Sequence, residues 1–319
     1  MISANDILKR SFIYVVTILG LTILSVILIA FTRPLAILIT LNNVPILVGA
    51  FLILSIAIYF QVSQTKISLQ NARLMGEIEK DLKTAKAVQK AILHQPPKIE
   101  GYDLSARWEP ASQLGGDFYD FFKRGDQLGI VIGDVSGHGV SSALVATLTE
   151  GIINEIGPGN LSLPQMLSYL NDRLLGSLGG KYNHLTLAMA LLNPKTNELE
   201  YALAGHPAPL IKNTKNEIKT LPGSGTLLGL YENEIFESQK IKLEPGEELL
   251  FYTDGLTEAR NTKKEELGEN FLMNELRNNE IAKTEQALNR LFEKVASIEP
   301  VAHDDRTAIF IRRYKPDLL

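Results

Sequence analysis

Four short acidic motifs in the second part of the chain contain the residues best suited to chemistry. Each places an aspartate at the end of an apolar run or in the turn after it, and the four are Asp117, Asp134, Asp254 and Asp304. A carboxylate at the end of an apolar strand is partly desolvated, and several that converge repel one another unless cations neutralise them. Oxygen ligands of this kind suit Mg²⁺ or Mn²⁺. We therefore expect a site for divalent cations.

The order of the motifs carries more information than any one of them. They read Leu-Gly-Gly-Asp-Phe-Tyr-Asp at 114–120, Ile-Gly-Asp-Val-Ser-Gly-His-Gly at 132–139, Phe-Tyr-Thr-Asp-Gly-Leu-Thr-Glu-Ala at 251–259 and His-Asp-Asp-Arg-Thr at 303–307. Glycines beside three of the aspartates allow sharp turns and a close approach of the backbone to ions. A single motif would equally fit a plain Asp-Gly turn.

Short β-branched and aliphatic runs separated by turn residues must position these motifs. We predict strands over 128–132, 185–192, 199–204, 248–253 and 307–312, and helices over 141–156, 163–178 and 284–298. The strands come in adjacent pairs and do not alternate singly with helices. This pattern favours an α+β fold with antiparallel sheets over a doubly wound sheet.

The first 60 residues have a different composition. No charge occurs over 12–32 or 34–65, and a 20-residue helix at about 1.5 Å per residue crosses a bilayer core of about 30 Å. We predict two transmembrane helices at about 12–31 and 44–60, the second either short or longer and kinked at Pro45. Lys9 and Arg10 before the pair, and Lys66 after it, place both ends in the cytoplasm. The alternative for the first run is a signal peptide.

This topology predicts a cytoplasmic tail at 1–11, a short external loop and an inner-membrane location with the remainder of the chain in the cytoplasm. A connecting helix is predicted over 61–95, ended by Pro96 and Pro97, before a domain over 96–319. Apolar residues recur along this helix in one narrow stripe, which Asn71 and Gln89 interrupt. The stripe predicts either a coiled coil that forms a homodimer through 67–93 or a helix packed along its own domain.

Composition excludes several classes of function. The net charge is −4, so no broad basic field is present to bind nucleic acid. Cysteine is absent, which removes disulfides, thiolate zinc sites and cysteine nucleophiles, including the thiolate route of tyrosine phosphatases.

The motifs resemble the SpoIIE/RsbU branch of the metal-dependent (PPM-type) serine/threonine protein phosphatases. The resemblance covers about residues 84–314 and includes the four acidic motifs and Ala-Gly-His-Pro at 204–207. It implies an αββα sandwich, two antiparallel sheets flanked by helices, behind the predicted transmembrane hairpin and connecting helix.

The resemblance also implies roles for individual residues around two divalent cations, Mn²⁺ or Mg²⁺. Asp134 would bridge the cations, and the Val135 carbonyl would help to hold one of them. Asp254 and Asp304 would complete the other site, and Asp117 would act directly or through bound water. Asp305, Asp120 and Glu258 do not match the family positions.

Two further assignments follow less directly from the family. Its larger eukaryotic members have a histidine, proposed as general acid, where this chain has Ser136, so that role does not transfer. His138 is the candidate catalytic residue, although its flanking glycines equally suit a turn. His206 is interpreted as structural. No phosphate-binding arginine is identified, but Arg107 and Arg306 lie near the motifs in sequence.

The resulting hypothesis is a membrane-anchored protein serine/threonine phosphatase. Kinship alone implies its substrate, a phosphorylated regulatory protein of the STAS type that antagonises an anti-sigma factor. A binding module without catalysis, a pseudophosphatase of the same fold, is the alternative. A diguanylate cyclase is a remote one, since its Gly-Gly-Asp loop continues with Glu-Phe whereas this loop continues with Phe-Tyr.

Overall fold

The chain has two compact units, Met1–Asp81 and Leu82–Leu319. The computed structural model describes residues 17, 20–25, 27–28, 34–178, 184–280 and 283–314. The predicted tail at 1–11 and most of the first predicted transmembrane helix lie outside the described residues. Residues 20–25 and 27–28 are helical. The transmembrane hairpin therefore stays a prediction.

The second predicted transmembrane helix and the connecting helix form one element, α2 (Pro34–Ile92), with Pro45 inside it. No break separates the two predicted helices at 61, and the limits of the second transmembrane helix stay a prediction. Within the part of the chain that the structure describes, Val44–Ile92 is the one helix segment long and apolar enough to cross a membrane. None of its most apolar stretch is buried. Ile46 and Ile53, for example, are 69% and 70% exposed.

The two ends of the predicted connecting helix differ in burial. Ile67, Leu74 and Ile78 of the narrow stripe are about half exposed in the single chain. Near the end of α2, Gln89 and Leu93 are buried within the second unit. The last turns thus pack on the domain, whereas the coiled coil over 67–93 stays a prediction.

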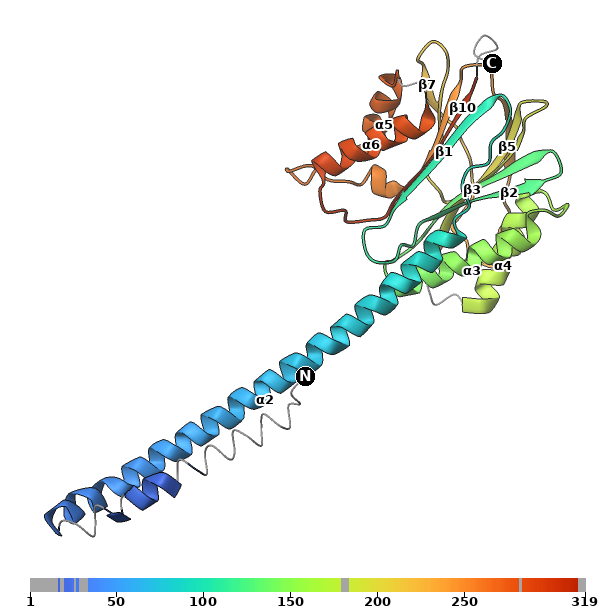
Figure 1. Cartoon of the computed structure of the whole chain (residues 1–319). Helices are drawn as coiled ribbons and strands as arrows, with labels where there is room; N and C mark the ends of the chain where they lie inside the picture. Colours follow the sequence, from blue (N-terminus) through green and yellow to red (C-terminus); the bar gives the residue numbers. More distant parts are fainter. Residues whose placement is uncertain are drawn as a thin grey trace. The chain divides into compact units, whose positions relative to one another are not determined.

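The second unit contains two five-stranded antiparallel sheets (Figure 1). The first has the order β1-β10-β9-β6-β7, and the second the order β2-β3-β4-β5-β8. The first sheet consists of β1 (Tyr102–Glu109), β10 (Arg306–Arg313), β9 (Glu248–Tyr252), β6 (Leu210–Lys212) and β7 (Ile218–Thr220). The second consists of β2 (Phe118–Arg124), β3 (Gln127–Val135), β4 (Leu185–Asn193), β5 (Glu198–Ala204) and β8 (Ser238–Lys242).

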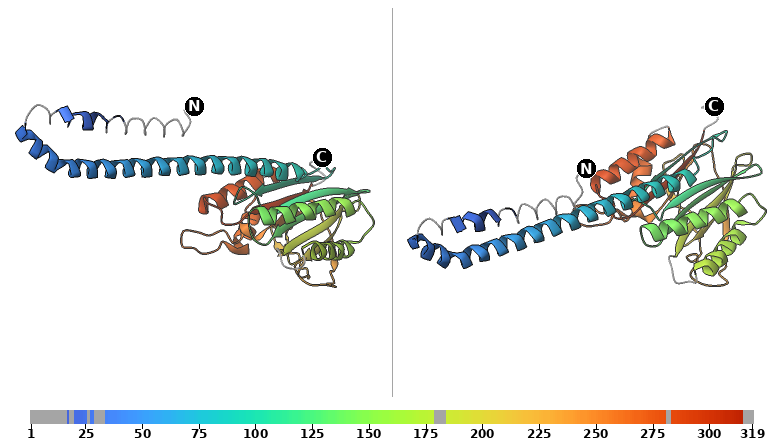
Figure 2. Two further views of the ribbon diagram at one scale, coloured as in Figure 1. Left: turned by 90° about the horizontal axis from the view of Figure 1, so that it is seen from below. Right: turned by 60° about the horizontal axis from the view of Figure 1, so that its bottom comes forward.

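Helices cover the two outer faces of the sandwich. Helices α3 (Val140–Ile156) and α4 (Leu163–Leu178) contact the second sheet, and α6 (Thr284–Ile298) and α5 (Gly268–Arg277) contact the first. Figure 2 shows the same layers from two other sides, with the green and the red helices on opposite faces. This arrangement confirms the predicted αββα sandwich.

Burial on both faces explains why the central strands are visible in the sequence. Strands β3, β4 and β9 are buried along almost their whole length. One core fills the space between the sheets and under α3 and α4, and a second lies under α5 and α6. Strands of this kind read as continuous apolar runs. The runs of β3 and β9 end where the motifs of Asp134 and Asp254 begin.

Candidate active site

The four aspartates come from both sheets. Asp117 immediately precedes β2 and Asp134 is near the end of β3. Asp254 opens the short 3₁₀ helix η1 (Asp254–Leu256) after β9, and Asp304 lies just before β10. Antiparallel pairing of β2 with β3 and of β9 with β10 brings the members of each pair to the same end of their sheet.

Three of these carboxylates, those of Asp134, Asp254 and Asp304, lie near enough to interact electrostatically. Burial, followed by the charges of Asp254 and Asp304, raises the pKa of Asp134 from 3.8 to about 7. Burial and then the charge of Asp304 raise the pKa of Asp254 to about 6. Carboxylates held in this way favour a proton or a cation between them. The oxygen donors therefore fit hard divalent cations, which would relieve the repulsion.

Direct coordination geometry is not formed among the described residues. No group of three aspartate, glutamate or histidine side chains there stands close enough to hold a single ion. Cations between these carboxylates would have to draw them together or use water as further ligands. The assignment of Asp134, Val135, Asp254 and Asp304 as ligands therefore stays a prediction.

Asp117 is held by the protein itself. Its side chain is 1% exposed, and its Oδ2 accepts hydrogen bonds from Thr253 Oγ1 at 2.7 Å and Thr307 Oγ1 at 2.6 Å. Burial, followed by the charge of Asp134, raises the pKa of Asp117. Two hydroxyl donors on one carboxylate oxygen fix its orientation, with Asp134 nearby. This arrangement suits a residue that acts beside the cations or through water.

The adjacent residues Asp304 and Asp305 face different environments. Asp305 is buried, and its carboxylate accepts hydrogen bonds from Ala111 N at 2.7 Å and Gly116 N at 2.5 Å. Asp304 is exposed and couples electrostatically to Asp134. Asp305 therefore holds the loop before Asp117, whereas Asp304 is available for a ligand.

Two glycines of the motifs are required by backbone packing. A Cβ on Gly116 would lie 2.7 Å from the Val135 carbonyl oxygen, and one on Gly255 would lie 2.0 Å from the Asp305 carbonyl oxygen. Both approaches are too close for any side chain. Close contact between the motifs accounts for these glycines.

The histidines have separate environments. His138 is exposed in the turn before α3, between Gly137 and Gly139, whose φ angles are 88° and 85°. It stays a candidate. His206 is buried, with Nδ1 2.8 Å from Thr186 Oγ1, and burial lowers its pKa to about 3. A neutral, buried histidine agrees with the structural role expected for it.

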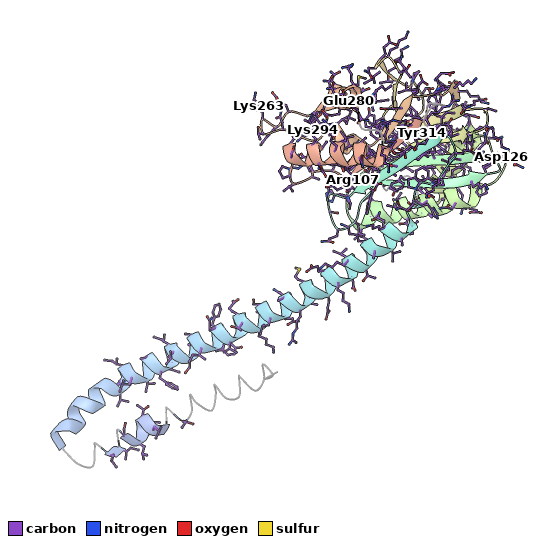
Figure 3. The ribbon with its side chains drawn as sticks, turned by 45° about the horizontal axis from the view of Figure 1, so that its top comes forward. Arg107, Asp126, Lys263, Glu280, Lys294 and Tyr314 are labelled. Carbon is purple, nitrogen blue, oxygen red and sulfur yellow. The ribbon has the colours of Figure 1, made fainter. Side chains whose placement is uncertain are left out.

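Both arginines near the motifs are engaged elsewhere. Arg306 is 1% exposed and forms an ion pair with Glu299 at 2.6 Å. Arg107, labelled in Figure 3, donates to Asn289 Oδ1 at 2.8 Å and stacks on the Phe292 ring at 4.8 Å. Neither side chain is therefore positioned to bind a phosphate at the aspartates.

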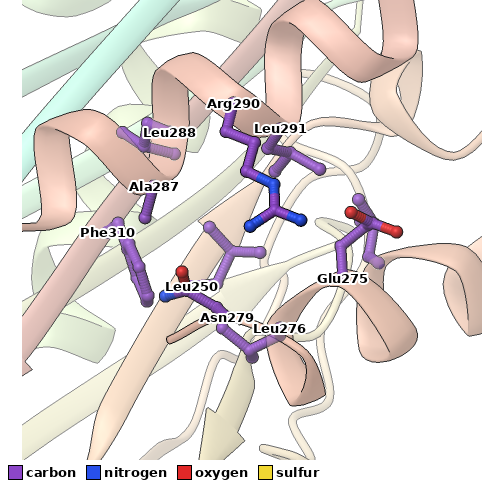
Figure 4. A pocket seen from close by; sticks show the side chains of 10 residues that line it. Leu250, Glu275, Leu276, Asn279, Ala287, Leu288, Arg290, Leu291 and Phe310 are labelled. Atoms are coloured by element: carbon purple, nitrogen blue, oxygen red, sulfur yellow. The ribbon is translucent and has the colours of Figure 1, made fainter. Parts of the chain in front are cut away.

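Two pockets differ in their relation to the aspartates. A cavity of about 110 Å³ adjoins Asp304, and it is lined by Gly255, Glu258, Ala259, Arg260, Glu299, His303 and Asp304. A narrow space of about 30 Å³ lies between α5, α6 and the first sheet (Figure 4). Leucines dominate its lining, with Arg290 and Glu275 beside them, and none of the four aspartates reaches it. Of these two pockets, the one lined by Asp304 borders the candidate site.

Sequence reasoning did not assign the residues that hold the aspartates. Thr253 and Thr307 lie inside the third and fourth acidic motifs. Their closeness in sequence to the aspartates is the feature that could have pointed to a supporting role. Asp305 does not match a family position, and its hydrogen bonds give it a structural role instead. Gln89 was noted only as a polar interruption of an apolar stripe, although its side chain contacts Gly115.

Comparison with known proteins finds one family over most of the second unit. The model of the family described as Stage II sporulation protein E (SpoIIE) matches residues 124–314. Protein IcfG of Synechocystis sp. is 31% identical over 216 residues, which are 59% of this chain and 34% of that protein. Phosphoserine phosphatase RsbU of Bacillus subtilis is 26% identical over 257 residues, 80% of this chain and 75% of that protein. The chain thus spans about a third of IcfG.

Solved structures share the fold. The SiaA-PP2C domain of Pseudomonas aeruginosa has a TM-score of 0.64 at 21% identity and covers 76% of this chain and 98% of its own. The RsbU and RsbW domains of Rv1364c from Mycobacterium tuberculosis have a TM-score of 0.59 at 26% identity. The match covers 69% of this chain and 63% of that chain. A PP2C-like fold is therefore common to these chains and this one.

Proposed function

The chain belongs to the SpoIIE family, and we propose that it is a metal-dependent protein serine/threonine phosphatase. It would hydrolyse the phosphate ester of phosphoserine or phosphothreonine on a regulatory protein. The names of two relatives from Bacillus subtilis, phosphoserine phosphatases RsbU and RsbP, support this reaction class.

The observation that carries the proposal is the convergence of aspartates from both sheets. Burial and mutual repulsion raise the pKa values of Asp134 to about 7 and of Asp254 to about 6, and Asp304 contributes to both. Such a cluster is costly to fold unless it serves a ligand, and its oxygen donors fit Mn²⁺ or Mg²⁺. Asp305, by contrast, has backbone N–H donors at both of its carboxylate oxygens.

We propose roles for individual residues in binding the cations, orienting water and protonating the leaving group. Asp134 and the Val135 carbonyl, with Asp254 and Asp304, would hold two divalent cations. When bound, the cations supply the Lewis acidity that activates water for in-line attack on phosphorus and neutralises charge on the phosphoryl oxygens. Asp117, fixed by Thr253 and Thr307, would orient water on the side facing Asp134. His138 stays the candidate for protonating the leaving group.

We further propose that α2 anchors the enzyme in the cytoplasmic membrane and that its substrate is a phosphorylated STAS-type antagonist. The unburied apolar stretch within Val44–Ile92 supports an anchor. The likeness to RsbU supports the substrate class. Retention of the full chain in a carbonate-washed membrane fraction is expected, whereas release by carbonate would contradict the anchor. A homodimer through residues 67–93 is part of the same proposal.

The test is phosphate release from a phosphoserine protein or peptide by the full chain in detergent. We expect release with Mn²⁺, none after chelation with EDTA, and none from Asp134→Asn. Binding of the phosphoprotein without release, by a folded chain loaded with Mn²⁺, would favour the pseudophosphatase. Formation of a cyclic dinucleotide from GTP would favour the cyclase instead.

A further inference from the structure

One side chain of α2 satisfies both backbone groups of a glycine in the first acidic motif. Gln89 Nε2 donates to the Gly115 carbonyl at 2.7 Å, and Gly115 N donates to Gln89 Oε1 at 3.2 Å. Gln89 is 4% exposed, so these hydrogen bonds are shielded from water. A carboxamide offers a donor and an acceptor side by side, which matches the two backbone groups of Gly115. The contact is therefore specific and goes beyond apolar packing.

A second attachment lies on the other side of Asp117. His94, which follows the end of α2, places Nδ1 2.5 Å from Asp120 Oδ1. Asp120 is fully buried, and it also accepts hydrogen bonds from Phe121 N at 2.7 Å and Asn154 Nδ2 at 2.9 Å. The end of α2 thus holds the motif at Gly115 and at Asp120. Asp117 lies between these two points.

The held loop has no free space on its other side. Gly116 N donates to Asp305 Oδ2 at 2.5 Å, and a Cβ on Gly115 would lie 2.9 Å from that same oxygen. Gly116 packs so tightly on the Val135 carbonyl that a Cβ would approach its oxygen to 2.7 Å. A shift of Gly115 would therefore move Asp117 or press on the Val135 carbonyl, because a packed interior transmits strain.

We propose that Gln89 is a positioning residue of the metal centre, which holds Gly115 so that Asp117 and the Val135 carbonyl face the cations correctly. This inference rests on the proposed function, since it takes the cation site as given. It makes cation affinity depend on the last turns of α2. A residue outside the acidic motifs, 26 positions before Gly115, then belongs to the machinery of the site.

The test measures cation binding and folding separately in the full chain with detergent. The variants are Gln89→Ala and the similarly long Gln89→Met, which keeps the size of the side chain but has no donor for the Gly115 carbonyl. Calorimetric titration with Mn²⁺ at pH 7.5 should show a dissociation constant raised about 10-fold in both variants, the scale typical of residues that support metal ligands. Lys90→Ala, one residue along and exposed, should bind Mn²⁺ as the wild type does.

The thermal midpoint of the metal-free protein separates positioning from plain stabilisation. A lowered midpoint with an unchanged Mn²⁺ dissociation constant in either folded variant would overturn the inference. It would leave the proposed function intact, because the wild type still binds Mn²⁺. Absence of Mn²⁺ binding by the wild type would overturn both. Gln89→Met keeps the size of the side chain, which leaves a folded variant to measure if Gln89→Ala does not fold.

Discussion

Thr307 Oγ1 donates a hydrogen bond of 2.6 Å to Asp117 Oδ2. Thr307 lies in β10 of the first sheet, and Asp117 immediately precedes β2 of the second. The bond therefore joins the two sheets at the edge that carries the four aspartates. Thr253 Oγ1 reaches the same oxygen at 2.7 Å and also accepts a bond from Thr307 N at 3.0 Å. The two threonines and Asp117 form one buried network.

Removing the Thr307 hydroxyl should destabilise the fold. In Thr307→Val the buried Asp117 carboxylate loses one of its two hydroxyl donors. We expect the free energy of unfolding to fall by about 1–3 kcal/mol. Urea unfolding of the metal-free protein at pH 7.5 measures this loss. Thr307→Ser retains the hydroxyl and should recover most of the stability. A loss of stability in the serine variant with none in the valine variant would show that the methyl group, and not the hydrogen bond, carries the effect.

Asp304 and Asp305 should respond differently to the same substitution. Asp305→Asn places an amide NH₂ group against a backbone N–H donor. We expect the free energy of unfolding to fall by about 1–3 kcal/mol. Asp304→Asn changes an exposed side chain, so stability should hold while Mn²⁺ affinity falls. Denaturation and Mn²⁺ titration of both variants check this. Lower stability of Asp304→Asn than of Asp305→Asn would reverse the two roles.

Glu150 should make the protein less stable as the pH rises. Both of its carboxyl oxygens are buried without a hydrogen-bond partner, and burial, then the charge of Asp120, raises its pKa from 4.5 to about 8. Between these values the folded chain keeps a proton that the unfolded chain has lost, so the free energy of unfolding falls with increasing pH. The difference corresponds to at most about 5 kcal/mol, at roughly 1.36 kcal/mol per pH unit.

The variant Glu150→Gln isolates this contribution. It is uncharged at every pH and close in shape, so it should match the wild type near pH 4.5 and be more stable at pH 8.5. Unfolding by urea at several pH values in EDTA provides the comparison. A stability difference that does not change with pH would show that Glu150 ionises in the folded chain as it does in the unfolded one.

Some elements were predictable because their buried residues form a continuous apolar run or a regular helical pattern. Strands β3, β4, β5, β9 and β10 and helices α3, α4 and α6 agree with the predicted ranges to within a few residues. Strand β2 was missed because it begins inside a motif and carries Asp120, Lys123 and Arg124. Strands β6 and β7 have three residues each, which is too short for a periodic signal.

The site divides in the same way. The aspartates stand out because glycines and apolar runs surround them within a few residues. The groups that hold them depend on contacts between distant segments, such as Asp117 with Thr307 or Gln89 with Gly115. The spacing of residues within one motif does not indicate which distant residue will contact it. The polar character of Gln89 on an apolar stripe was visible, but its partner was not.

The number of Mn²⁺ ions bound per chain tests the central claim most directly, since that claim is that the four aspartates form a two-cation site. Calorimetry on the full chain should give two ions for the wild type and a loss of tight binding for Asp134→Asn. Asp126→Asn is the matched control, because Asp126 is exposed and pairs with Lys195 at 2.6 Å. It should bind two ions. Unchanged binding by Asp134→Asn would contradict the account.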